Sequence, residues 1–219
     1  MIEIADMTLD ELRVALAPHL APNAAFDGWN AKAVAAAADA IGADQDVARL
    51  AVPGDAVGMI DLWFADIDRR MAAALPPETL GAMKIRGRIT ALIEARLDAL
   101  APDREALRRA VAILAMPQNA ARAAKLGWRS ADVMWLLAGD TATDYNHYTK
   151  RAMLAGIYAA TIAAFLNDES EGQAETRAFL ARRIENIMQF EKAKARLAGR
   201  SDHRFSLSRF VGRLRYHAR

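Results

Sequence analysis

Side chains able to perform catalysis are few in this chain, and they do not gather into a known pattern. The sequence has no cysteine and four histidines, at positions 19, 147, 203 and 217. It contains no Glu-x-x-His pair, Gly-x-Ser-x-Gly turn, phosphate-binding loop or dinucleotide fingerprint, so these classes of enzyme are not indicated. Asp140 and Asp144 flank a turn, where carboxylates commonly cap helices. We therefore predict a protein that is not an enzyme, with no catalytic residue, no metal ligand and no cofactor.

Helices must position whatever site exists, because Ala, Leu, Arg and Glu dominate and alternating β-branched residues are absent. Thr8 to Glu11 reads as a capping box, and Asn30 reads as a helix cap. Cap, Gly and Pro signals predict helices at about 8–18, 30–42, 46–50, 55–74, 79–100, 103–115, 119–125, 130–138, 143–167 and 174–197. The expected fold class is all-α. The expected parts are an N-terminal part at 1–75, a helical core at 76–198 and a basic tail at 199–219.

Charge is unevenly distributed along the 219 residues. Residues 200–219 carry six arginines and one acid, so the remaining chain keeps 23 of the 29 basic residues and 26 of the 27 acidic ones. The basic tail predicts an interaction with an anionic surface. The first six residues are acidic, which predicts neither secretion nor organelle import. The expected location is a bacterial cytoplasm, peripheral to the inner (cytoplasmic) membrane.

The tail has the pattern of an amphipathic helix that lies in a lipid interface. Its apolar stripe and flanking cations are the predicted membrane-binding residues: Leu207, Phe210, Val211, Leu214, Arg204, Arg209, Arg213 and Arg215. Two alternatives remain, namely a tail helix docked on protein and an unstructured basic end.

The segments 31–41 and 46–50, joined by Gly42, have the outline of a helix-turn-helix. A DNA-reading surface needs Lys or Arg to neutralise phosphates. Residues 26–50 instead carry two basic residues against four aspartates. We therefore predict a degenerate helix-turn-helix and no nucleic-acid partner.

The segment from Gly139 to Leu154, GDTATDYNHYTKRAML, passes from a polar turn through an aromatic and basic patch into an uncharged run. This arrangement resembles the lipid-binding accessory protein family of ubiquinone biosynthesis (coenzyme Q biosynthesis protein nine). Further matching elements are 26–29, 116–119, 132–135, 176–180 and 183–186, so the resemblance covers about 10–197. It implies a homodimer of tetracycline-repressor-like fold that is not catalytic, binds an isoprenoid quinone lipid and serves a demethoxyubiquinone hydroxylase or an equivalent enzyme.

The uncharged run 152–166 predicts a helix that is buried all round. Its many small residues indicate either a closely packed neighbour or a cavity. The resemblance favours a lipid cavity within the core. The predicted lipid-binding residues are Trp135, Met153, Leu154, Ile157, Tyr158, Ile162, Phe165, Ile184 and Met188.

The resemblance also implies a surface that meets the hydroxylase, formed by Asp132, Met134, His147 and Tyr148. The position of His147 is usually Trp in the family, so this chain departs from the pattern there. The function expected is a lipid-binding accessory role. The alternatives are a ligand-responsive transcription regulator of the same fold and a helical scaffold without a small ligand.

Overall fold

The computed structural model describes residues 4–141 and 145–201. Over these residues the chain forms helices and no strand, which confirms the all-α expectation. The α-helices are α1 (Leu9–Asp27), α2 (Ala31–Ile41), α3 (Gln45–Ala51), α4 (Ala56–Ala74), α5 (Pro77–Gly81), α6 (Ile85–Leu100), α7 (Arg104–Leu114), α8 (Ala120–Leu137), α9 (Tyr145–Asn167) and α10 (Ala174–Ser201). The chain divides into two compact units, Met1–Leu180 and Ala181–Arg219, which are described separately. The boundaries predicted at 75/76 and 198/199 stay predictions.

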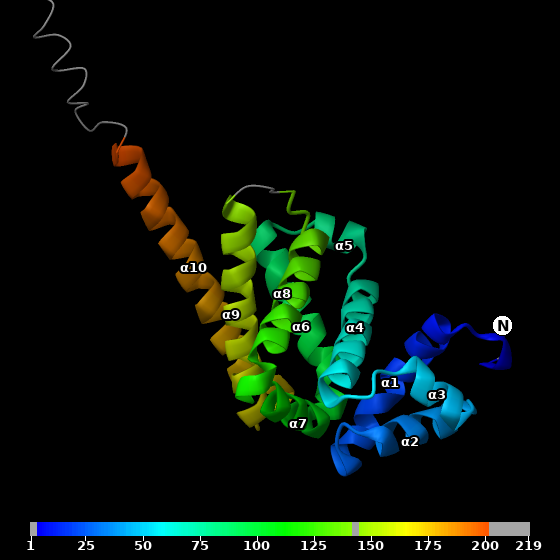
Figure 1. Cartoon of the computed structure of the whole chain (residues 1–219). Coiled ribbons are helices and arrows are strands. Elements are labelled where there is room, and N and C mark those ends of the chain that lie inside the picture. Colours follow the sequence, from blue (N-terminus) through cyan, green and yellow to red (C-terminus); the bar gives the residue numbers. More distant parts are fainter. Residues whose placement is uncertain (1–3, 142–144, 202–219) are drawn as a thin grey trace, which may run out of the picture. The chain divides into compact units, whose positions relative to one another are not determined.

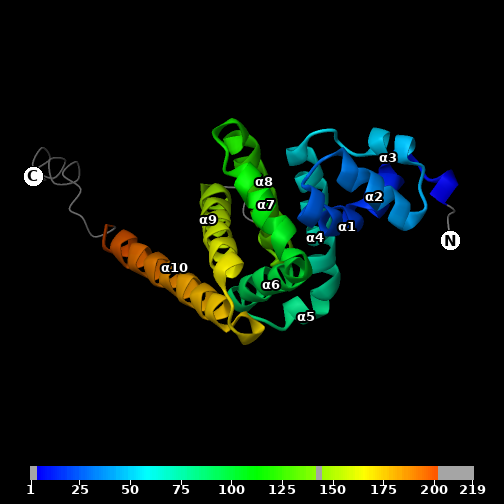
Figure 2. The ribbon, with the colours of Figure 1, turned by 90° about the horizontal axis from the view of Figure 1, so that it is seen from below.

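The first three helices form a cluster beside α4, as Figure 2 shows. The Thr8–Glu11 capping box is present, and Asn30 caps α2 as predicted. Gly42 ends α2 in the left-handed conformation, at φ 72°, and α3 follows. The helix-turn-helix outline is therefore confirmed.

Helix α1 is longer than predicted, because Pro18 and Pro22 lie inside it instead of ending it. A proline at position 18 removes the amide that would bond the carbonyl of Val14. The Arg69 guanidinium donates to that carbonyl at 3.5 Å, which partly replaces the lost bond. Burial of one side of α1 favours continuing the helix.

Helices α4, α6, α8 and α9 pack together and form the body of the first unit (Figure 1). Two predicted boundaries within it are wrong. The segment 79–100 divides into α5 and α6, whereas 119–138 is one helix, α8, without a break at Gly127. Ser130, the first residue of the helix predicted at 130–138, lies in the middle of α8 and is buried, where it accepts a hydrogen bond from Arg96 at 2.9 Å.

The centre of this body is polar. Arg96 of α6 is fully buried and donates to Asp68 of α4, to Ser130 of α8 and, at 2.6 Å, to the hydroxyl of Tyr158 of α9. Its guanidinium also lies 5.0 Å from the Tyr158 ring centre. Because a buried charge is tolerated only when paired and hydrogen-bonded, this network ties four helices into one arrangement.

The corner between α9 and α10 is held by Asp168. Its carboxylate accepts bonds from the hydroxyls of Ser170 and Thr176 and from both of their backbone amides. Those bonds, led by the Ser170 hydroxyl, hold the pKa of Asp168 well below its usual range. Arg104 donates to the Asp168 carbonyl at 2.7 Å, so α7 is joined to the same corner.

Helix α10 continues through Gly199 to Ser201, so the end predicted for this helix at residue 197 is too early. Helical periodicity overrides a single glycine there. All eight predicted membrane-binding residues lie beyond Ser201, outside the described residues.

Candidate functional site

Helix α9 presents one face to the core. Leu154, Tyr158, Ile162 and Phe165 are buried, and Phe165 is completely inaccessible. Three of these four lie at intervals of four residues along α9, which places them on one face. The structure therefore brings four of the predicted lipid-binding residues together.

The opposite face of α9 is solvent-exposed in the single chain, so the run is not buried all round as predicted. Its exposed residues are small: Ala152, Gly156, Ala159 and Ala163. The absence of charge in 152–166 misled the prediction, because alanine and glycine are tolerated on either kind of face. Met153 and Ile157 are half-buried between the two faces.

Trp135 of α8 contacts the first turns of α9. Its indole N–H donates to the Lys150 carbonyl at 3.1 Å, and the Lys150 ammonium lies 5.4 Å from its ring centre. Ile184 is buried but belongs to the second unit. The side chain of Met188 lies outside the described residues.

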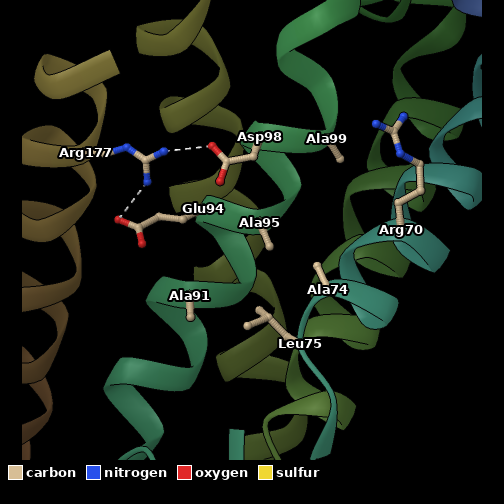
Figure 3. A pocket seen from close by; sticks show the side chains of 9 residues that line it. All are labelled: Arg70, Ala74, Leu75, Ala91, Glu94, Ala95, Asp98, Ala99 and Arg177. Carbon is tan, nitrogen blue, oxygen red and sulfur yellow. Dashed lines mark hydrogen bonds and ion pairs between the residues drawn. The ribbon is translucent and has the colours of Figure 1, made fainter. Parts of the chain in front are cut away.

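A surface cavity of about 500 Å³ lies elsewhere, between the end of α4, one side of α6 and the first turn of α10. Figure 3 shows its aliphatic floor and charged rim. Arg177 forms one wall and pairs with Asp98 at 2.8 Å and Glu94 at 3.6 Å. Arg70 stands at the other side. None of the nine predicted lipid-binding residues lines this cavity.

The carboxyl group of Asp103, near Arg70, has a shifted pKa. Burial raises the pKa of Asp103, and the positive charge of Arg70 opposes that rise. The cavity thus combines a small alanine floor with Arg177, whose charge Asp98 and Glu94 already neutralise.

The 139–154 segment is held by a compact ion network. Arg151 is almost completely buried and pairs with Asp132 and, at 3.1 Å, with Asp140. Lys150 pairs with Asp140 at 2.7 Å. These bonds join the last turns of α8 to the first turns of α9. The motif therefore shapes the junction of the two helices.

The predicted partner-binding residues divide into exposed and buried ones. Tyr148 is 61% exposed, and His147 and Asp132 are half-buried. Met134 is fully buried, so its prediction as a surface residue is wrong in this arrangement: it lies on the core side of α8. The other three stay predictions.

The sequence analysis did not single out three residues that the structure shows to be important around α8 and α9. Trp128 lies 6.1 Å from Tyr148, ring centre to ring centre, and extends its aromatic surface. Its place one helical turn before Asp132 could have indicated this. Arg151 and Arg96 were missed because arginine is rarely buried, and nothing local signals that it is.

The described part of the chain contains neither a metal cluster nor a membrane-spanning helix. Within 4–141 and 145–201, no group of three metal-binding side chains gathers. Among the helices of the same ranges, none has the length and hydropathy needed to cross a membrane.

The fold and the junction define a tetracycline-repressor-like helical protein. A tetracycline-repressor-type transcriptional regulator from Nitrosomonas europaea matches with a TM-score of 0.63 and 25% identity, covering 80% of this chain and 97% of that one. This likeness confirms the expected fold.

The sequence comparisons are more specific. The COQ9 family model matches residues 120–191. Ubiquinone biosynthesis protein COQ9, mitochondrial, of Rattus norvegicus is 34% identical over 168 residues, which is 74% of this chain and 54% of that protein. Its Homo sapiens counterpart is 33% identical over 168 residues, covering 74% and 52%. These matches confirm the resemblance to the COQ9 family that the motifs indicate.

The comparisons overturn one prediction. The relatives are mitochondrial proteins of eukaryotes, which conflicts with a bacterial protein at the inner membrane. The chain spans about half the length of the curated relatives it matches. Its first residues were therefore a poor basis for inferring location.

Proposed function

We propose that this chain acts in ubiquinone biosynthesis as a non-catalytic accessory protein that binds an isoprenoid quinone intermediate and presents it to a hydroxylase. The observation that carries this proposal is the position of the family match. Residues 120–191 include α8, α9 and the first part of α10, and therefore all of the predicted lipid-contacting and partner-contacting residues.

The apolar side of α9 is the proposed lipid-contacting surface. Leu154, Ile162 and Phe165 are closely packed, so an isoprenoid chain must displace or separate them to bind there. Half-buried Met153 and Ile157 offer the point of entry, because they already border solvent. Burying a prenyl chain against such side chains stabilises the complex by roughly 25 cal/mol per Å² of apolar surface removed from water.

The hydroxylase is proposed to dock around Tyr148, with His147, Trp128 and Asp132 beside it. Exposed aromatic side chains make frequent interface anchors. The basic tail is proposed to hold the protein on an anionic membrane, close to its hydrophobic cargo. A second copy of the chain is proposed to cover the exposed small residues of α9.

Two measurements test the function. Deleting the gene should lower ubiquinone and accumulate a precursor at the hydroxylation stage. Mass spectrometry of the natively purified protein should detect a prenylated quinone intermediate. Normal quinone with no accumulated intermediate would contradict the biosynthetic role, and a protein without lipid would contradict the cargo role.

A second candidate is a transcription regulator, favoured by the solved structure that this chain resembles. Its weakness is electrostatic, because aspartates cap α3 and occupy its first turn where a DNA reader needs cations. A gel shift at low salt with genomic DNA fragments decides between the two: sequence-selective retardation would favour the regulator.

A further inference from the structure

A phenol interrupts the buried apolar face of α9. Among the four buried residues of the proposed lipid-contacting side, Tyr158 alone carries a polar group. Leu154 lies one turn before it and Ile162 one turn after it, so aliphatic side chains flank the phenol along the helix. Tyr158 is 6% exposed, which places its hydroxyl inside the protein.

The Tyr158 hydroxyl accepts a hydrogen bond but donates none within the described part of the chain. Arg96 Nε donates to it at 2.6 Å. A hydroxyl carries one donor besides its lone pairs, and no described acceptor takes the Tyr158 proton. By contrast, the buried hydroxyl of Thr161 donates to the Ile157 carbonyl at 2.8 Å. A buried donor without an acceptor is costly, so a ligand that brings an acceptor to Tyr158 is favoured.

Arg96 fixes the direction of this donor. Its guanidinium is held by Asp68, by Ser130 at 2.9 Å and by the rings of Tyr158 and Phe64, whose centres lie 5.0 and 5.8 Å from it. A guanidinium cannot accept a hydrogen bond, so it can only occupy a lone pair of the phenol and leaves the proton available. Ser130 is held by Arg96 in the same way, but it lies on α8, outside the proposed lipid-contacting side of α9.

The charges around the phenol are balanced, which favours a neutral ligand. Asp68 pairs with Arg96, and Asp61 pairs with Arg129 beside them. A carboxylate or phosphate placed here would be a buried charge without a counter-ion. A neutral oxygen acceptor, such as a ring carbonyl or methoxy group, needs no further charge.

We propose that the Tyr158 O–H donates to an oxygen on the ring of the lipid cargo and is the group that distinguishes an oxygenated ring from plain hydrocarbon. The prenyl chain packs against Leu154 and Ile162, and Arg96 acts as a positioning residue for the phenol. A site built to hydrogen-bond a ligand rejects an analogue that lacks the matching group. This inference rests on the proposed function, because it names the recognition of that cargo.

A competition between two matched lipids tests the role of the hydroxyl. The full chain is incubated with neutral phosphatidylcholine vesicles that contain equal amounts of 2-geranyl-1,4-benzoquinone and geranylbenzene, which share the chain and differ in the ring oxygens. The protein is then recovered, and both compounds bound to it are quantified by mass spectrometry. Tyr158→Phe should lower the ratio of bound quinone to bound hydrocarbon about fivefold relative to the wild type, the usual effect of one neutral hydrogen bond. Comparing the two ratios cancels the different partitioning of the two compounds into the vesicles.

Thr161→Val is the matched control. It removes a buried hydroxyl from the same helix, three residues away, but that hydroxyl already has its acceptor in the Ile157 carbonyl. The bound ratio should therefore stay at the wild-type value, and circular dichroism should show that both variants keep their helical content. An equal fall in both variants would mean that general loosening of α9 sets the selectivity, and would overturn the proposal.

The remaining outcomes separate this inference from the proposed function. Retention of both compounds, in a ratio that Tyr158→Phe leaves unchanged, would overturn the role of Tyr158 and keep the lipid-binding function. Retention of neither compound by the wild type would overturn lipid binding and this inference with it.

Infrared spectroscopy of the wild type gives a measure that needs no folded variant. A hydrogen bond weakens the carbonyl bond, so the C=O stretch of protein-bound, carbon-13-labelled quinone should lie at lower frequency than in the vesicles. A bound quinone whose carbonyl bands match those in the vesicles would overturn the proposal.

Discussion

The buried pair of Arg96 and Asp68 makes a quantitative prediction about stability. Arg96 is fully buried, and the Asp68 side chain is 10% exposed. Asp68→Ala leaves a guanidinium in the core without its counter-ion, which typically costs about 3–5 kcal/mol. Arg96 keeps its bonds to Ser130 and Tyr158, so we expect the lower end, about 3 kcal/mol.

In a chain of this size, each kcal/mol lowers the melting temperature by about 2–4 °C, so Asp68→Ala should lower it by roughly 6–12 °C. Urea unfolding followed by far-UV circular dichroism measures the free energy directly. Asp98→Ala is the control, because it breaks the exposed pair with Arg177 and should cost no more than about 1 kcal/mol.

A double variant tests the reasoning more sharply. Asp68→Leu with Arg96→Met removes both charges and fills similar volume, which is often neutral or even stabilising. The double variant should therefore be more stable than Asp68→Ala. A loss below about 1 kcal/mol for Asp68→Ala, or a double variant less stable than the single one, would refute the view that an uncompensated buried charge sets the cost.

Four further outcomes are expected. Ile157→Glu should abolish lipid co-purification while helical content is kept, because a carboxylate in an apolar site must be desolvated or neutralised; lipid retained by a folded variant places the cargo elsewhere. Tyr148→Lys should weaken hydroxylase binding more than about tenfold, as loss of an aromatic anchor does. Unchanged affinity by calorimetry would show that Tyr148 does not contribute to the interface. Truncation after Gly199 should weaken sedimentation with anionic vesicles and its salt dependence, since the six tail arginines leave with the apolar stripe; unchanged sedimentation would exclude the tail. Asp168→Asn should lower the free energy of unfolding at neutral pH. Because the pKa of Asp168 is depressed in the folded wild type, the stability difference between wild type and variant should shrink as pH falls below 3.8. A stability difference that persists at low pH would show that the charge of the carboxylate is irrelevant.

Local signals predicted most of the helices correctly. The Thr8–Glu11 box, the Asn30 cap and the Gly42 turn all involve groups within a few residues of one another, so their bonds form whatever the rest of the chain does. The same locality makes the 139–154 segment recognisable. The all-α class, the helix-turn-helix outline and the family resemblance therefore follow from the sequence alone.

Tertiary packing decided what local signals could not. Helix α1 passes through Pro18 because burial of its inner side, helped by Arg69, offsets the lost backbone bond. Met134 belongs to the core and Tyr148 to the surface, although both read as apolar or aromatic members of one motif.

Arg96 shows the limit most clearly. Its burial depends on Asp68, Ser130 and Tyr158, which are 28, 34 and 62 residues away in the chain. The sequence by itself determined which segments are helical and which family they resemble, because those properties are written in short-range patterns. Which faces of the helices meet, and which charges are buried where they meet, was decided only by the tertiary structure, because desolvation depends on all the neighbours that folding brings together.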